Sequence, residues 1–123
     1  MIKLVFCLRR LPHLSREEFQ RYWFERHAPL VRSHAAALKI RRYVQTHTGE
    51  QPLNDALQAS RGGPEAYDGV AELWWDSVES LAEPGATEAG QQAGALLLED
   101  ERRFIDLEHS PLFFAEEHPI VSR

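Results

Sequence analysis

The stretch from residue 15 to residue 38 constrains the fold more than any other part of the sequence. Ser15 and Glu18 have the spacing of a capping box, in which two residues reciprocally satisfy backbone groups of a helix's first turn. At about 100° per residue, the large apolar side chains that follow fall on one stripe, together with two histidines. The stripe comprises Phe19, Trp23, Phe24, His27, Leu30, Val31, His34 and Leu38. We therefore predict a long amphipathic helix with both histidines on its apolar face.

Pro29 interrupts this helix. It has no backbone N–H to donate and its ring crowds the preceding turn, so we expect a kink or short break around His27 and Ala28. A histidine beside a helix break, on an otherwise apolar face, has two interpretations. Either His27 faces a ligand as an acid–base group, or it is a core histidine bonded to a carbonyl that the proline leaves free.

The composition is that of one globular domain covering residues 1–123, with 43% hydrophobic and 27% charged residues. The formal net charge of −5 leaves no basic surplus to neutralise phosphates, which argues against nucleic acid as a partner. Cys7 is the only cysteine, so there is no internal disulfide framework and a cytoplasmic location is expected. The opening apolar run from Leu4 to Leu8 is shorter than the core of a secretion signal, and no stretch approaches the length of a membrane span. We therefore expect no membrane partner.

Four stretches of the chain read as β-strands. Residues 2–9 are apolar at odd and even positions alike, which is typical of a central strand covered on both faces. Residues 39–47, 67–76 and 112–118 predict further strands. The last of these meets Pro119, which suits the edge of a sheet.

Helices and connections are expected between these strands. A short helix is predicted at residues 77–82 and a further helical segment at residues 86–99, followed by a turn at residues 100–106. Residues 48–66 are rich in Gly, Pro, Asn and Gln, and Asn54 could cap one short turn of helix there. A connection this long in a small domain is either a functional lid or partly disordered.

The order of elements is β-α-β-β-α-β, which predicts an α+β fold of ferredoxin-like topology. In such a fold the helices cover one face of an antiparallel sheet. We expect Cys7 to point toward the helices, and Ile2, Leu4 and Phe6 to form the opposite face. A lone domain would leave those apolar side chains in water, so a homodimer joined face to face through the sheets is the physical expectation.

Three blocks of the sequence carry a resemblance to a known family. They are Phe19-x-x-Tyr22-Trp23-x-x-x-His27-Ala28-Pro29-Leu30-Val31, Tyr67-Asp68-Gly69-Val70-Ala71-Glu72-Leu73-Trp74 and Asp100-Glu101-x-x-Phe104-x-Asp106. Together they resemble the EthD family over nearly the whole chain. The resemblance implies the dimeric α+β barrel, in which two ferredoxin-like subunits join through their sheets. Proteins of that fold include cofactor-free isomerases of muconolactones, polyketide cyclases, quinol-type monooxygenases and haem-binding enzymes, and their ligands usually lie in a cleft between sheet and helices.

Two residues are candidates for catalysis. His27 matches the histidine of the family's first block, and a neutral imidazole in an apolar cleft could exchange a proton near neutral pH. Glu72 lies in the middle of a strand in a sheet that we expect to be covered on both faces, where a carboxylate is costly unless it is paired. Glu72 could be an acid–base with a raised pKa or the partner that orients His27. The alternative is a salt bridge to an arginine of a neighbouring strand.

Five more residues are candidates for lining the cleft: Trp23, His34, Tyr43, Trp74 and Cys7. Cys7 could act as a nucleophile beside His27, or be a small buried hydrophobe. His34 and the aromatic residues could equally be core. No metal is expected, because His27 and His34 are two helical turns apart and the sequence has no HxxxH, CxxC or HExxH motif.

The leading function is therefore a cofactor-free enzyme that moves protons on a small cyclic or aromatic molecule, as an isomerase, cyclase or lyase. A second hypothesis is a quinol-type monooxygenase, in which the substrate itself activates oxygen. A third is a non-enzymatic accessory protein that binds a small ligand. In each case the expected partners are a small molecule and a second copy of the chain.

Overall fold

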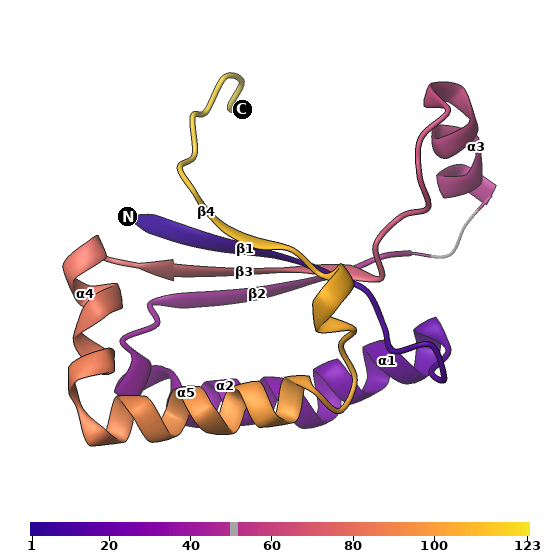
Figure 1. The fold of residues 1–123 in the computed structure, drawn as a ribbon. Helices are drawn as coiled ribbons and strands as arrows, with labels where there is room; N and C mark the ends of the chain where they lie inside the picture. The colour runs from indigo at the N-terminus through magenta and orange to yellow at the C-terminus, as the bar shows by residue number, and fades with distance from the viewer. Residues whose placement is uncertain (50–51) are drawn as a thin grey trace.

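The computed structural model describes residues 1–49 and 52–123. It contains a four-stranded antiparallel sheet with helices packed against one face (Figure 1). The strands are β1 (Ile2–Leu8), β2 (Arg42–His47), β3 (Gly69–Trp75) and β4 (Leu112–Ala115), in the order β2-β3-β1-β4. This is the ferredoxin-like α+β topology that the sequence predicts, with the first strand inside the sheet and the last at an edge.

The first helical segment is the long amphipathic element expected from the sequence. It consists of α1 (Arg16–Tyr22), a π-helical turn (Trp23–His27) and α2 (Ala28–Leu38). The capping box of Ser15 and Glu18 is present, so the predicted start of this helix is confirmed. The predicted irregularity takes the form of the π-helical turn, in which the Ala28 N–H bonds the Trp23 carbonyl immediately before Pro29.

The π-helical turn decides which side chains of this helix are buried. In an unbroken α-helix, residues four apart drift by about 40° at each step. The wide turn corrects that drift, so the buried residues are Phe19, Trp23, His27 and Val31. Phe24, which the sequence places on the apolar stripe, is instead 65% exposed.

The second helix of this layer is α5 (Glu88–Glu101), which lies beside α2 beneath the sheet (Figure 1). The Thr87 hydroxyl caps it by accepting a hydrogen bond from the Gly90 N–H. The predicted turn at residues 100–106 is wrong at its first two positions, because α5 continues through Asp100 and Glu101. The reason is that the buried stripe of this helix includes Asp100, a polar residue that hydrophobic periodicity does not detect.

Two shorter helices complete the chain. The helix α4 (Val78–Ala82) begins after Ser77, close to its predicted position, and a 3₁₀ turn (Glu83–Ala86) joins it to α5. The helix α3 (Pro52–Arg61) stands off the end of the sheet (Figure 1) and is longer than the single turn expected there. The remainder of that predicted connection includes residues 50–51, which lie outside the described residues. No helix in the described ranges is both long enough and apolar enough to cross a membrane.

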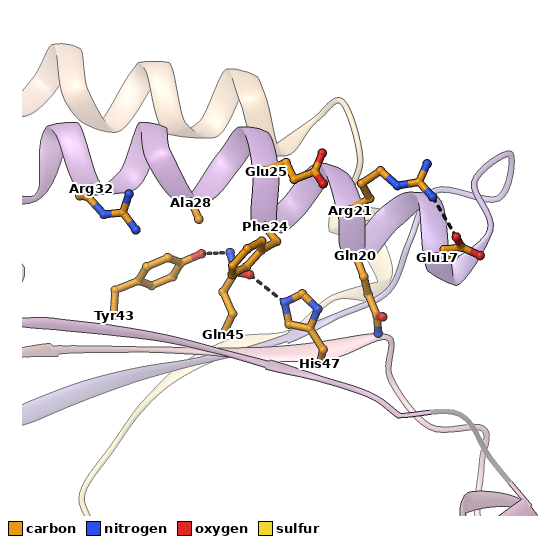
Figure 2. A pocket seen from close by; sticks show the side chains of 10 residues that line it. All are labelled: Glu17, Gln20, Arg21, Phe24, Glu25, Ala28, Arg32, Tyr43, Gln45 and His47. Atoms are coloured by element: carbon orange, nitrogen blue, oxygen red, sulfur yellow. Dashed lines mark hydrogen bonds and ion pairs between the residues drawn. The ribbon is translucent and has the colours of Figure 1, made fainter.

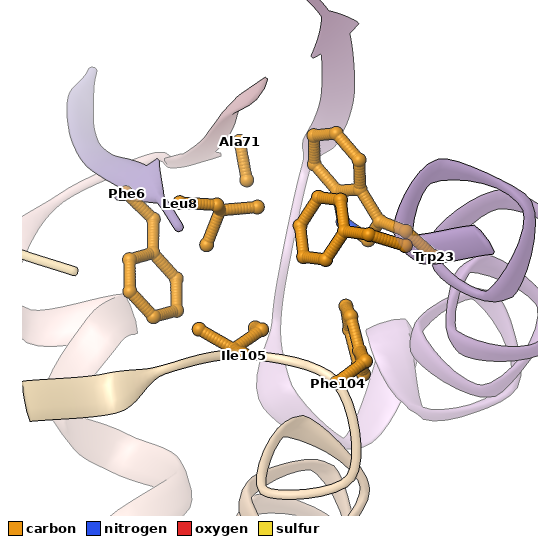
Figure 3. Packing of buried hydrophobic residues seen from close by; sticks show 7 residues of the cluster. Phe6, Leu8, Trp23, Ala71, Phe104 and Ile105 are labelled. Carbon is orange, nitrogen blue, oxygen red and sulfur yellow. The ribbon is translucent and has the colours of Figure 1, made fainter. Parts of the chain in front are cut away.

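The sheet turns the opposite face toward the helices from the one expected. Phe6 and Leu8 are buried among Trp23, Phe104 and Ile105 (Figure 3). Side chains of a strand alternate between faces, so Cys7 points away from the helices. The predicted orientation is therefore wrong, because both parities of this strand are apolar and alternation alone does not say which one the helices cover.

Candidate active site

A buried histidine and a buried aspartate meet where the first helical segment packs against α5. The Nδ1 atom of His27, at the end of the π-helical turn, lies 2.7 Å from the Oδ2 oxygen of Asp100 in the last turn of α5. The Tyr22 hydroxyl donates to the other oxygen of Asp100 at 2.6 Å, and the Arg103 guanidinium contacts that oxygen at 3.3 Å. Both His27 and Asp100 are 5% exposed. The aspartate is therefore held by three donors.

These contacts fix the protonation states of the pair. Burial by itself would raise the pKa of Asp100, but the hydrogen bonds from Tyr22 and His27 hold it below the ordinary value. Burial lowers the pKa of His27 below its ordinary value, and the bond to Asp100 opposes that only in part. At neutral pH the imidazole is therefore neutral, with its proton on Nδ1 facing the carboxylate. Nε2 then carries a lone pair, and no residue in the described ranges is bonded to it.

His27 lines an apolar cavity of about 220 Å³ between the sheet and the helices. Its walls are apolar side chains from β1, β3, α2 and α5, including Leu4, Phe6, Val31, Ala71, Leu73 and Leu97. Three residues of the wall can exchange protons: His27, Tyr43 and Glu101. A cavity of this size and lining suits one small ring compound rather than a large cofactor.

Glu101 is the site residue that sequence reasoning missed. It follows Asp100 on α5, and one helical step of about 100° brings it to the cavity wall while Asp100 faces His27. Burial, and then the charge of Asp100, raises the pKa of Glu101 to about 7. Its carboxyl group makes no hydrogen bond or ion pair with any residue that the structure describes. Asp100 and Glu101 begin the third sequence block of the family. Because that block was predicted to be a turn, the sequence did not indicate which way either side chain points.

Two of the predicted cleft residues do line this cavity. Trp23 is 1% exposed and its ring stacks on that of His47, with centroids 4.6 Å apart. Tyr43 borders the cavity from β2, and its hydroxyl accepts a hydrogen bond from Gln45 Nε2 at 2.8 Å. Burial raises the pKa of Tyr43, so its hydroxyl stays protonated at neutral pH.

The predicted catalytic residue Glu72 does not reach this cavity. It lies on the sheet face that points away from the helices, where its carboxylate pairs with Lys3 at 2.5 Å. The expectation that Glu72 acts with His27 is therefore corrected by the alternation of side chains along β3. The salt bridge that was the alternative exists, although its cation is Lys3 and not an arginine.

Cys7 is also separated from His27 by the sheet, and Trp74 does not line the cavity. Burial raises the pKa of the Cys7 thiol, so the thiol is protonated at neutral pH and is a poor nucleophile. The Trp74 indole donates to Glu117 at 3.0 Å, with the Arg42 guanidinium 4.6 Å from its ring. The predictions that Cys7 and Trp74 line the cleft are therefore wrong. Like Glu72, both residues occupy strand positions that face away from the helices.

His34 is not part of the cavity wall either. Its Nδ1 bonds the Leu30 carbonyl at 2.9 Å, one turn back along α2, and contacts the Ser33 hydroxyl at 3.0 Å. Across residues 1–49 and 52–123, no group of three or more His, Cys, Asp or Glu side chains is arranged to hold a metal ion.

An open groove of about 630 Å³ lies on the other side of Tyr43 (Figure 2). It runs between the first helical segment and the edge strand β2. Its floor is a hydrogen-bonded row in which His47 contacts the Gln45 side-chain oxygen at 2.8 Å and Gln45 donates to Tyr43. The exposed Phe24 ring lies over this row, edge-on to His47. Phe24, which is not part of the core, therefore lines the groove. Tyr43 thus separates the groove from the cavity of His27.

Comparison with known proteins places this geometry in a family. Solved structures share the fold: an EthD family protein from Bacillus halodurans C-125 is 24% identical, with a TM-score of 0.62 and coverage of 96% of this chain and 99% of that one. A dimeric protein of unknown function with a ferredoxin-like fold, from Bacteroides fragilis, is 9% identical, with a TM-score of 0.58 and coverage of 94% and 95%. SnoaB, a cofactor-independent oxygenase from Streptomyces nogalater, is 15% identical, with a TM-score of 0.50 and coverage of 94% and 91%.

No functionally curated protein matches the chain. The sequence model of the EthD domain, however, matches residues 11–108, which include His27, Asp100 and Glu101. The resemblance drawn from the three sequence blocks is therefore confirmed, and this chain belongs to the EthD family.

Proposed function

We propose that this protein is an enzyme that transfers a proton on a small cyclic or aromatic molecule bound in the cavity, with His27 as the acid–base group. One observation carries the proposal: His27, oriented at Nδ1 by the ionised Asp100, lines an apolar cavity. A neutral imidazole with an anchored Nδ1–H offers Nε2 as a base. Burial holds its pKa below the ordinary value, so the base form dominates at neutral pH.

The arrangement supports proton transfer more than other chemistry. The carboxylate both fixes the tautomer and stabilises the imidazolium that forms when His27 takes a proton. A positioned acid–base group of this kind typically contributes a rate factor of about 10² to 10⁴. Isomerisation, cyclisation and elimination all begin with such a step. No cofactor is required by this scheme, because His27 can return the proton that it removes.

A second candidate is a cofactor-independent oxygenase, which is how the relative SnoaB is described. The same base would remove a proton from a quinol hydroxyl, and the substrate anion would then react with oxygen. Oxygen uptake in the presence of quinols distinguishes this activity from isomerisation. A ligand that binds and is returned unchanged would instead favour an accessory protein.

We also propose that the protein acts as a homodimer through the outer face of its sheet. Val5 and Cys7 lie on this face beside Phe113, which is paired with Val5 across β1 and β4 and is 49% exposed. The relative from Bacteroides fragilis is dimeric. Phe113→Glu should convert the dimer to a monomer in light scattering, whereas an unchanged mass would exclude this face as the interface. The unpaired Cys7 thiol supports a reducing cytoplasm as the site of action.

The central test compares His27→Asn with His34→Asn, the same substitution on the same helical segment but outside the cavity. Hydrogen–deuterium exchange at substrate carbons, followed by NMR over a panel of lactones, cyclic ketones and phenols, detects proton transfer whatever product is formed. His27→Asn should lower the exchange rate by at least about 100-fold, and His34→Asn should leave it unchanged. Equal rates in the wild type and in His27→Asn would overturn the proposal.

A further inference from the structure

We infer that Glu101 is a second catalytic group, which donates a hydrogen bond and then a proton to a substrate carbonyl oxygen while His27 removes a proton from the adjacent carbon. The cavity accordingly takes an uncharged cyclic ketone or lactone with an enolisable C–H bond. This inference rests on the proposed function and adds to it the acid partner and the substrate class.

The placement of the two groups is the first support. His27 comes from the π-helical turn and Glu101 from the last turn of α5, and both line the cavity of about 220 Å³. Asp100 cannot serve as the acid, because its two oxygens already accept hydrogen bonds from Tyr22 and His27. Glu101 has no hydrogen-bond or ionic partner among the described residues, so its carboxyl group is left for a ligand.

The environment of Glu101 disfavours its ionised form, so that it can act as an acid. The groups that face it are His27, which lines the same cavity, Tyr43 from β2, and its own neighbours Asp100 and Arg102 on α5. Burial and the charge of Asp100 disfavour a second carboxylate, and the Arg102 charge opposes this only in part. Tyr43 is a weaker acid than Glu101, because burial raises its pKa above the already high value of an ordinary tyrosine.

The charge of the cavity wall selects the substrate. No lysine or arginine lines the cavity among the residues that the structure describes, so a substrate carboxylate would lie near Asp100 and Glu101 without a cation to pair with it. An unpaired buried anion is costly. An uncharged carbonyl compound avoids that cost and accepts the one hydrogen bond that Glu101 can donate.

The step balances without an outside reagent. His27 Nε2 takes the proton of the carbon adjacent to the carbonyl, and the electron pair of that C–H bond forms the C=C bond of an enol. The carbonyl oxygen receives the Glu101 proton, which leaves an imidazolium and a carboxylate in the cavity wall. Reversal returns each proton, and return of the His27 proton to a conjugated carbon gives the isomer. Nothing is oxidised or reduced.

The test measures deuterium incorporation next to the carbonyl of cyclohexanone and of 4-oxocyclohexanecarboxylate, which differ in the carboxylate. The wild type should exchange cyclohexanone at least about 10-fold faster than the charged ketone. Its rate should rise with pH as His27 loses its proton and fall again above about pH 7 as Glu101 ionises. Comparable rates for the two ketones, or no exchange of cyclohexanone by the wild type, would overturn the inference.

The matched variants are Glu101→Gln and, as a control, Glu116→Gln in the exposed C-terminal segment. The glutamine amide still donates a hydrogen bond but cannot transfer a proton, so the rate should fall about 10- to 100-fold and the decline above about pH 7 should disappear. An unchanged rate and pH profile in Glu101→Gln would refute the role of Glu101. If His27→Asn still abolished exchange, the proposed function would stand without this inference; if neither variant changed the rate, both would fail.

A second measurement does not depend on a variant that folds. The carboxyl carbon of Glu101, observed by NMR in the wild type, should titrate at higher pH when cyclohexanone is bound, because the ketone accepts a hydrogen bond only from the protonated acid. A titration that cyclohexanone leaves unmoved, or shifts to lower pH, would contradict the inference.

Discussion

The Nδ1 atom of His27 lies 2.7 Å from a carboxylate oxygen of Asp100, a residue 73 positions further along the chain. The contact joins the π-helical turn of the first helical segment to the last turn of α5. It also explains why two polar residues occupy positions where hydrophobic side chains would otherwise fill the core. The neutral imidazole donates one proton to an ionised partner and retains a basic nitrogen beside the cavity.

Replacing Asp100 with asparagine should weaken the base without removing it. The amide has one acceptor oxygen and one NH2 donor, so Tyr22 and His27 can no longer both donate to it, and the tautomer of His27 is no longer fixed. We expect proton transfer to slow by about 10²- to 10⁴-fold and the free energy of unfolding to fall by about 1–3 kcal/mol. Exchange kinetics and urea unfolding measure the two effects. A loss of stability with undiminished exchange per folded molecule would show that Asp100 is purely structural.

Glu101 should make the protein less stable as the pH rises. Its pKa in the folded protein is about 7, against an ordinary value of 4.5, so the folded state binds more protons between these two values. Stability should therefore decrease from about pH 4.5 to pH 7, by an amount on the order of 2 kcal/mol. Glu101→Gln should remove this decrease in urea titrations at several pH values. The same slope in the variant would mean that another group is responsible.

Asp68 should make the opposite contribution at low pH. It is 3% exposed and accepts bonds from the Arg10 backbone N–H at 2.8 Å and from Arg16 at 3.0 Å. Burial alone would raise the pKa of Asp68, but these donors hold it below the ordinary value. Its stabilisation is therefore complete above about pH 4 and is lost as the pH falls through the lowered pKa of the folded state.

Asp68→Asn should accordingly cost about 2–3 kcal/mol at neutral pH and flatten the acid limb of the stability curve. Asp76→Asn is the matched control, because Asp76 pairs with Arg41 at 3.6 Å with both side chains more than half exposed. The control should change the free energy of unfolding by less than about 1 kcal/mol. Equal effects of the two substitutions would contradict the assignment of Asp68 as a buried anchor.

Two glycines of α5 should respond in opposite directions to alanine. A Cβ at Gly90 would overlap the Pro84 carbonyl oxygen, whereas a Cβ at Gly94 has no atom within 4 Å among the described residues. Gly90→Ala should therefore destabilise the protein by about 1–3 kcal/mol. Gly94→Ala should stabilise the helix by about 0.5–1 kcal/mol. Thermal unfolding of both variants checks this, and equal melting temperatures would contradict the close approach of α5 to the Glu83–Ala86 turn.

Local signals in the sequence carried most of the fold. Some features depend only on neighbours within a few residues and can therefore be predicted from the sequence alone. They are the Ser15–Glu18 capping box, the irregularity before Pro29 and the β-rich stretches. The same holds for His27 as a candidate, because a histidine on an apolar stripe is unusual wherever the helix packs. The three sequence blocks were sufficient for the family.

Which other residues join His27 in the site depends on tertiary packing. Glu72 and Cys7 were expected beside His27, but strand alternation only divides side chains into two sets, and the packing of Phe6 and Leu8 against the helices decided which set faces the cavity. Asp100 and Glu101 belong to the site because α5 continues for two residues beyond its predicted end. The sequence by itself determined the elements, the family and the central histidine, since these follow from local spacing. Only the tertiary structure decided which carboxylates meet that histidine, because such contacts depend on how distant elements pack.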